Sequence, residues 1–180
     1  MADLYSPTVG VVKYDPRWPL LFAAEKKRIL SVLSPLQVIV EHVGSTAVPG
    51  LDAKPVIDIL LGLCMAELTD VRLDALRLIG YGYVRARRGS LCLYRGRPRS
   101  HFIHIVEMGG TEWQEQILFR DYLRAHPEDA LRYAALKREM AAGGATGATY
   151  ARGKRGLIVE IIERARRWNR GERSRFEGGI

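Results

Sequence analysis

A short run between two apolar segments contains the residue types that bind phosphate. It reads EHVGSTAVPGLDAKPVIDILLG over residues 41–62. A glycine such as Gly44 lets an anion approach the backbone closely, and Ser45 adds a hydroxyl beside the exposed amide groups. The spacing of Gly, Lys and Ser is not that of a Walker loop. We therefore expect a phosphate-binding loop of another kind, stiffened by Pro49 and Pro55.

Asp58 follows this loop in a run that is otherwise apolar. An unpaired carboxylate in such a strand would cost on the order of several kcal/mol, so Asp58 needs a metal ion, a cation or hydrogen-bond donors. Lys54, four residues upstream, could neutralise either Asp58 or a bound phosphate. A structural ion pair with an arginine is the commoner explanation of a single buried Asp, and both explanations stay open.

The chain has four histidines, and two of them lie in predicted strands near this chemistry. His42 precedes Gly44 by two residues, so on an extended strand it faces the same side and could bind phosphate or act as a base. A lone strand histidine is as readily a satisfied core group. His104 belongs to the later strand HFIHIVE, whereas His101 and His126 are expected at the surface or as caps.

The segments around the loop must position these side chains. After a turn at Asp15 and Pro16, an apolar stripe predicts a helix from Trp18 to near Ser34, and β-branched residues predict a strand over 36–43 that ends at Gly44. The apolar run at 56–63 is typical of a central strand covered on both faces. Similar patterns predict a helix at 68–78, strands at 80–84, 90–95 and 101–107, and helices at 111–126, 127–142 and 150–168. This order indicates an α+β fold with a small mixed β-sheet, flanking helices and a helical C-terminal half.

Length and composition favour one globular domain. The chain has 180 residues, of which 47% are hydrophobic and 27% charged, so we assign residues 1–168 to a single domain and 169–180 to a polar, flexible tail. Cys64 and Cys92 lie in apolar stretches without zinc-ligand spacing and are expected to be reduced core residues. Neither a leader nor a run of membrane-spanning length is visible, so we expect a cytoplasmic protein with no membrane partner.

The formal net charge of +8 favours an anionic partner. Part of this charge lies in a predicted hairpin that is rich in arginine. Its members are Arg85, Arg87, Arg88, Arg95, Arg97 and Arg99. Solvated surface charge is the simplest explanation. Nucleic-acid binding ranks last, because the aromatic platform that stacks single-stranded bases is missing.

These residues resemble a known family. The run EHVGSTAVPGLDAKPVIDI is similar to the signature of the GrpB-like family, a branch of the nucleotidyltransferase superfamily with the polymerase-β-like fold. The blocks YDPRWPLLFAAEKKRI, HFIHIVE, FRDYLRAHPEDALRYAALKRE and YARGKRGLIVEII resemble it too, so the likeness extends from about residue 9 to about residue 168. It implies a nucleotidyltransferase-like sheet with a Gly-Ser phosphate loop, followed by an acidic strand that holds Mg²⁺ or Mn²⁺.

The resemblance also implies roles for individual residues. Gly44, Ser45 and Thr46 match the phosphate loop, and Asp58 matches the first of two metal-binding carboxylates on alternate strand residues. The second position is Leu60, which has no donor atom for a metal ion. This departure puts a two-metal mechanism in doubt.

Later parts of the chain supply the remaining predicted site residues. His104 stands where a third carboxylate is usual, so Asp58 and His104 are the predicted metal ligands. In the helical half, Arg120 and Lys154 match recurrent family elements. They are predicted to bind the nucleotide phosphates together with Lys54.

Three functions follow, in order of preference. The first is a divalent-metal-dependent nucleotidyltransferase that binds a nucleoside triphosphate, ATP before others, and transfers the nucleoside monophosphate to an unknown small-molecule acceptor. Asp58, His42 and Lys54 would be its catalytic residues. The second, favoured by Leu60, is a non-catalytic module that binds a nucleotide or a coenzyme A precursor. The third is a nucleic-acid-binding protein.

Overall fold

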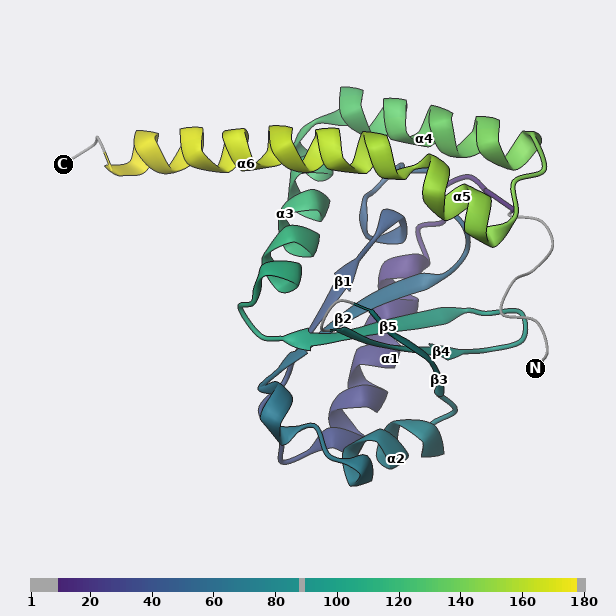
Figure 1. The fold of residues 1–180 in the computed structure, drawn as a ribbon, viewed down its shortest axis with the longest axis vertical. Coiled ribbons are helices and arrows are strands. Elements are labelled where there is room, and N and C mark those ends of the chain that lie inside the picture. The colour runs from purple at the N-terminus through teal and green to yellow at the C-terminus, as the bar shows by residue number, and fades with distance from the viewer. Residues whose placement is uncertain (1–9, 88–89, 178–180) are drawn as a thin grey trace.

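The computed structural model describes residues 10–87 and 90–177, and Figure 1 shows their arrangement. The elements in chain order are α1 (Trp18–Leu33), β1 (Ile39–Val43), η1 (Ser45–Ala47), β2 (Ile57–Leu63), η2 (Met65–Glu67), α2 (Asp70–Leu78), β3 (Gly82–Arg87), β4 (Ser90–Arg95), β5 (His101–Glu107), α3 (Thr111–Ala125), α4 (Pro127–Ala142), α5 (Gly147–Gly153) and α6 (Arg155–Glu177). The side chains of Arg85 and Arg87, and all of Arg88, lie outside the described residues.

Five strands form one mixed sheet in the order β1-β2-β5-β4-β3. β2 pairs antiparallel with β1 and parallel with β5, and β4 pairs antiparallel with both β5 and β3. The predicted α+β class with a small mixed sheet is confirmed. β2 has a neighbour on each side and covered faces, which explains why its sequence is almost continuously apolar.

One face of the sheet packs against α1 and α2. β2 sends Ile57, Ile59 and Leu61 to this face, where each is at most 2% exposed, and α1 adds Ile29 and Leu33 to the same apolar cluster. The helix ends here because a serine and a proline follow, and proline cannot continue a helix. The first core of the molecule therefore lies between α1, α2 and the sheet.

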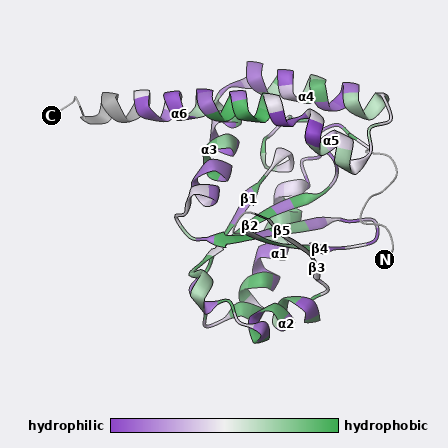
Figure 2. Cartoon of the chain, viewed as in Figure 1, coloured by the Kyte–Doolittle hydropathy of each residue, from purple (hydrophilic) through white to green (hydrophobic). Residues whose placement is uncertain are grey.

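The C-terminal helices form a second layer with an apolar cluster of its own, which includes Leu123 of α3, Tyr133 of α4 and Ile161 of α6. Figure 1 shows α4 and α6 lying across the same end of the molecule, with α6 extending beyond the other elements. In Figure 2 the half of α6 beside α4 carries apolar bands, whereas the coloured turns farther along α6 are mostly hydrophilic. The apolar half of α6 is thus the part that packs.

Two regions differ from the sequence-based expectation. α6 continues to Glu177, so the helix enters the range 169–180 that was predicted as a tail. Cys92 is buried as predicted, but the assignment of Cys64 to the core is wrong, since it is exposed. Cys64 directly follows the last residue of β2, where the chain leaves the sheet.

Among the described residues, no helix has both the length and the apolar character that crossing a bilayer requires.

Candidate active site

The predicted phosphate loop begins with a close contact between Gly44 and Asp58. Gly44 leaves β1 with φ 70°, a left-handed conformation that favours glycine. A Cβ at this position would lie only 2.5 Å from Oδ2 of Asp58. The short turn η1 follows at once, with Ser45 half-buried and Thr46 and Ala47 buried. The sequence thus folds so that the loop and the acidic strand touch.

Asp58 and His104 lie close together on the face of the sheet opposite α1. His104 Nε2 is 3.9 Å from Asp58 Oδ1, and His104 Nδ1 is 3.9 Å from the Cys92 Sγ. Burial disfavours the charged imidazole, but the Asp58 carboxylate and the Cys92 thiol together raise the pKa of His104 to about 9. At neutral pH the imidazole is therefore charged and forms an ion pair with Asp58.

Leu60 points to the same face but is fully buried in an apolar cluster. It packs with Val43 and Val106 beneath Trp113 and Ile117 of α3. Nearby, the indole of Trp113 is so close to the sheet that a Cβ at Gly62 would lie 2.5 Å from it. The position of the second family carboxylate is therefore part of the core beneath α3.

These donors do not fit the two-metal arrangement of the superfamily. Asp58 supplies one carboxylate, Leu60 supplies no donor, and His104 supplies an imidazole where a third carboxylate is usual. In the part of the chain that the structure describes, no cluster of three or more His, Cys, Asp or Glu side chains is placed to hold a metal ion. Chemistry that needs two bridged metals has no basis in this set of ligands.

A cavity of about 390 Å³ opens in front of Asp58. Its walls come from both layers of the molecule. They are formed by Ser45, Thr46, Ala53, Lys54, Val56, Asp58, Arg99, Phe102, His104, Lys137, Gly147, Tyr150, Ala151 and Lys154. Cations outnumber carboxylates in this wall, because four Lys or Arg side chains face a single Asp. The cavity is therefore suited to a ligand with several negative charges.

Lys54 and Lys154 approach the cavity on either side of one aromatic ring. Their Nζ atoms lie 5.1 Å and 4.5 Å from the centroid of Tyr150. Burial lowers the pKa of both lysines, although Asp58 acts in the opposite direction. Within the described residues, neither ammonium group has a hydrogen bond or ion pair with a carboxylate. Both groups are held by the tyrosine and remain available to an anion.

Lys137 of α4 is a site residue that the sequence analysis missed. Its side chain is 1% exposed, and its Nζ donates a 2.9 Å hydrogen bond to Ser45 Oγ and a second one to the carbonyl oxygen of Asp52. Burial and the nearby Lys154 lower the pKa of Lys137 to about 7. A signal was present in the sequence, because this lysine continues the apolar stripe of Ala130, Tyr133 and Ala134 at helical spacing.

The structure places most of the predicted site residues at this cavity. Those in the wall are Ser45, Thr46, Lys54, Asp58, His104 and Lys154, with Gly44 directly behind Asp58.

Two predicted residues lie elsewhere. His42 stacks on Phe22 of α1, with ring centroids 4.7 Å apart, and its Nε2 is 3.0 Å from Thr46 Oγ1. Burial lowers its pKa to about 4, so the ring is neutral and supports the loop from behind. Arg120 forms ion pairs with Glu41 and Asp121 at 2.7 and 2.8 Å, away from the cavity wall.

The chain is similar in sequence to a longer bacterial protein and in structure to a solved one. The UPF0157 protein YqkA of Bacillus subtilis is 34% identical over 178 residues, which are 96% of this chain and 51% of the relative. The chain thus spans about half the length of that relative. The crystal structure of the conserved protein GrpB from Enterococcus faecalis superimposes with a TM-score of 0.80 at 34% identity, covering 87% of this chain and 96% of the other.

A more distant solved structure shares the fold alone. The GLD-2/RNP-8 complex matches with a TM-score of 0.56 at 12% identity, over 84% of this chain and 60% of that chain. This likeness agrees with the nucleotidyltransferase-like fold that the family resemblance implied. A family model described as GrpB protein matches residues 8–164. The chain therefore belongs to the GrpB family and has a nucleotidyltransferase-like fold.

Proposed function

We propose that the protein binds a nucleoside triphosphate in this cavity and holds its phosphates mainly with side-chain cations. The observation that carries the proposal is the imbalance of charge in the cavity wall. Lys54, Lys137 and Lys154 converge there with Arg99, and Asp58 is the single carboxylate opposite them. Like charges brought together at a partly buried surface repel one another, and a polyanion relieves this repulsion.

The phosphate loop contributes a second group of contacts to the proposed complex. Ser45 already accepts a hydrogen bond from Lys137, so its hydroxyl is oriented, and the same hydroxyl faces the cavity. A phosphate oxygen within reach of both Ser45 Oγ and Lys137 Nζ would receive two donors, one of them charged. Hydrogen bonds to charged groups contribute about 1.5–3 kcal/mol each, enough to decide whether a nucleotide binds.

The test is calorimetric titration of ATP, GTP, CTP and UTP, with and without Mg²⁺ or Mn²⁺. We expect binding by the natural protein without added metal and a roughly tenfold to hundredfold weaker affinity for Lys154→Met. Lys27→Met, an exposed lysine of α1 outside the cavity wall, is the matched control and should bind normally. Absence of binding to all four nucleotides by the natural protein would contradict the proposal.

Transfer of a nucleoside monophosphate to a small acceptor is the second candidate. The contact of Gly44 with Asp58 favours it, because it joins the phosphate loop to a carboxylate as catalysis in this superfamily requires. A single Mg²⁺ held by Asp58 and the substrate's own phosphates would neutralise charge there. Asp58→Asn separates the two candidates: loss of Mn²⁺-enhanced binding supports transfer, whereas unchanged binding with and without Mn²⁺ supports a non-catalytic module.

A further inference from the structure

Arg99 is a cation of the cavity wall for which the family resemblance implies no role. It is half-buried, faces the cavity, and its guanidinium carbon lies 4.5 Å from the ring centroid of Tyr94. Among the described side chains, no carboxylate forms an ion pair with it. A guanidinium that is stacked on an aromatic ring and unpaired has its donor edge free, and this edge suits the oxygens of a phosphate.

The position of Arg99 depends on a tight turn between β4 and β5. Gly96 opens the turn with φ 98°, and Ser100 closes it by donating its backbone N–H to the carbonyl oxygen of Arg95 at 2.9 Å. A Cβ at Gly96 would lie 2.6 Å from Ser100 Oγ, so the turn is closely packed. Arg95 and His101, which pair across the two strands, form the base of this turn.

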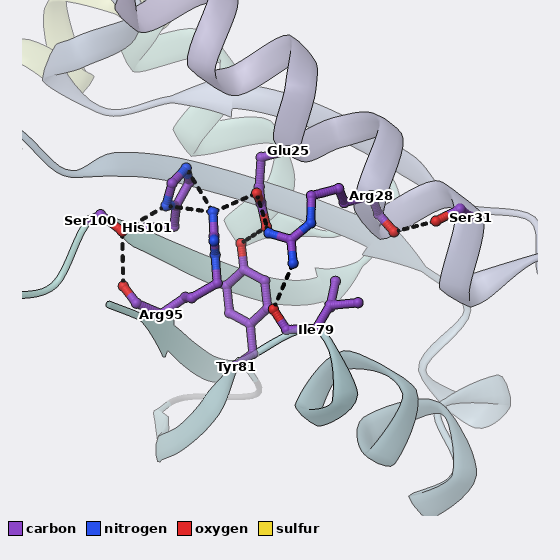
Figure 3. Close-up of polar contacts among 8 residues, drawn as sticks. All are labelled: Glu25, Arg28, Ser31, Ile79, Tyr81, Arg95, Ser100 and His101. Atoms are coloured by element: carbon purple, nitrogen blue, oxygen red, sulfur yellow. Dashed lines mark hydrogen bonds and ion pairs between the residues drawn. The ribbon is translucent and has the colours of Figure 1, made fainter. Parts of the chain in front are cut away.

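That base is anchored on the other face of the sheet by a buried carboxylate. Figure 3 shows Glu25 of α1 pointing to Arg95, whose guanidinium donates to Glu25 Oε2 at 2.6 Å. The same guanidinium nitrogen lies 3.1 Å from His101 Nδ1. Ser100 Oγ lies 2.9 Å from His101 Nδ1. Since arginine only donates and lies within 3.1 and 3.4 Å of the two ring nitrogens, one of these nitrogens accepts and the ring is neutral. The expectation that His101 lies at the surface is wrong, because it is 8% exposed.

Glu25 receives more donors than a simple ion pair would need. Tyr81 donates its hydroxyl to Glu25 Oε1 at 2.9 Å, and Arg28 of the same helix adds a salt bridge at 3.0 Å. The carboxylate itself is 2% exposed. An apolar group in its place is often equally stabilising, so a buried network of this kind is better explained by the geometry it specifies. The geometry here is that of the turn that carries Arg99.

We propose that Arg99 binds a phosphate of the ligand and that Glu25 is a positioning residue for it, acting across the sheet through Arg95 and the turn. The inference rests on the proposed nucleotide binding. It also predicts which ligand is preferred. Arg99 is a fourth cation beside the three lysines, and these four cations are more than a single phosphate group can contact. Arg99 therefore favours a triphosphate over a monophosphate.

The test is a double-mutant cycle on ATP affinity, measured by calorimetry. Arg99→Ala should weaken ATP binding roughly tenfold to a hundredfold and weaken AMP binding much less. Glu25→Gln should weaken ATP binding several-fold in the natural background and leave it unchanged in the Arg99→Ala background. A role of Glu25 in general stability would instead lower affinity equally in both backgrounds.

Two further variants keep the test valid if Glu25→Gln folds poorly. Gly96→Ala disturbs the turn without touching Glu25 and should show the same dependence on Arg99. Glu160→Gln, at a half-exposed ion pair between α4 and α6, is the control. It should change neither the affinity for ATP nor the affinity for AMP.

The possible failures are distinguishable. If the natural protein binds no nucleotide, the proposed function fails first. If it binds ATP but Arg99→Ala binds ATP equally well, or if Glu25→Gln and Gly96→Ala act independently of Arg99, this inference is overturned while the proposed function stands.

Discussion

At the scale of single residues, Lys137 makes nucleotide binding sensitive to pH. Its pKa of about 7 in the free protein lies far below the usual value of 10.5. A bound phosphate favours the charged ammonium and raises this pKa, so binding above pH 7 takes up a proton. We therefore expect ATP affinity to fall as pH rises from 7 to 9, by up to about tenfold per unit.

Titrations in two buffers with different heats of ionisation measure this proton uptake directly. Lys137→Arg stays charged throughout the range, so it removes the titration of this residue and should show a flatter profile. An equally steep profile in the natural protein and in Lys137→Arg would show that Lys137 does not titrate on binding.

The second prediction at this scale concerns Gly44. Gly44→Ala combines a left-handed backbone with a Cβ 2.5 Å from Asp58 Oδ2. We expect the free energy of unfolding to fall by about 1–3 kcal/mol, measured by urea denaturation. Gly156→Ala, in α6 with open space around it, is the control and should be neutral or slightly stabilising. Equal stability of Gly44→Ala and the natural protein would refute the account of this contact.

At the scale of elements, the packing of α3 on β2 decides what position 60 can hold. Leu60→Asp restores the carboxylate of the superfamily but puts a charge into the cluster beneath Trp113. We expect the free energy of unfolding to fall by roughly 3–5 kcal/mol, with no gain in Mn²⁺ affinity. Leu60→Met, which conserves volume, should cost less than about 1.5 kcal/mol. A stable Leu60→Asp protein that binds Mn²⁺ tightly would contradict this view.

Elements also explain which features the sequence could predict. The loop after β1, the apolar β2 and the helices have local sequence patterns, and these patterns predict them. Lys137 was missed because its contact with Ser45 joins residues far apart, and only the packing of α4 over the loop creates it. The orientation of His42 towards Phe22 likewise depends on which face of the sheet α1 covers. The features of the site that the sequence did not predict therefore arise from packing between residues far apart in the chain.

At the scale of the whole molecule, the cavity joins two layers with separate apolar cores. Asp58 and Arg99 come from the sheet layer, and Lys137 and Lys154 from the helical layer. A ligand that contacts both layers must stabilise both against unfolding. ATP at about 100 times its Kd should add about 2.7 kcal/mol and raise the Tm by on the order of 5–10 °C.

Thermal unfolding monitored by circular dichroism measures this shift. Lys154→Met at the same ATP concentration should show about half of this increase in Tm or less, since its affinity is roughly tenfold to a hundredfold lower. A natural protein whose Tm does not respond to ATP would not bind it between the two layers.

The cluster of cations in the cavity wall also sets a limit on how stable the empty protein can be. Lys54, Lys137 and Lys154 lose hydration and repel one another when no anion is present, as their lowered pKa values indicate. Selection for stability alone would replace them with apolar residues. The same Lys154→Met change that weakens ATP binding should therefore make the ligand-free protein more resistant to heat. The cations of the cavity thus lower the stability of the ligand-free protein while they keep a site that recognises an anion.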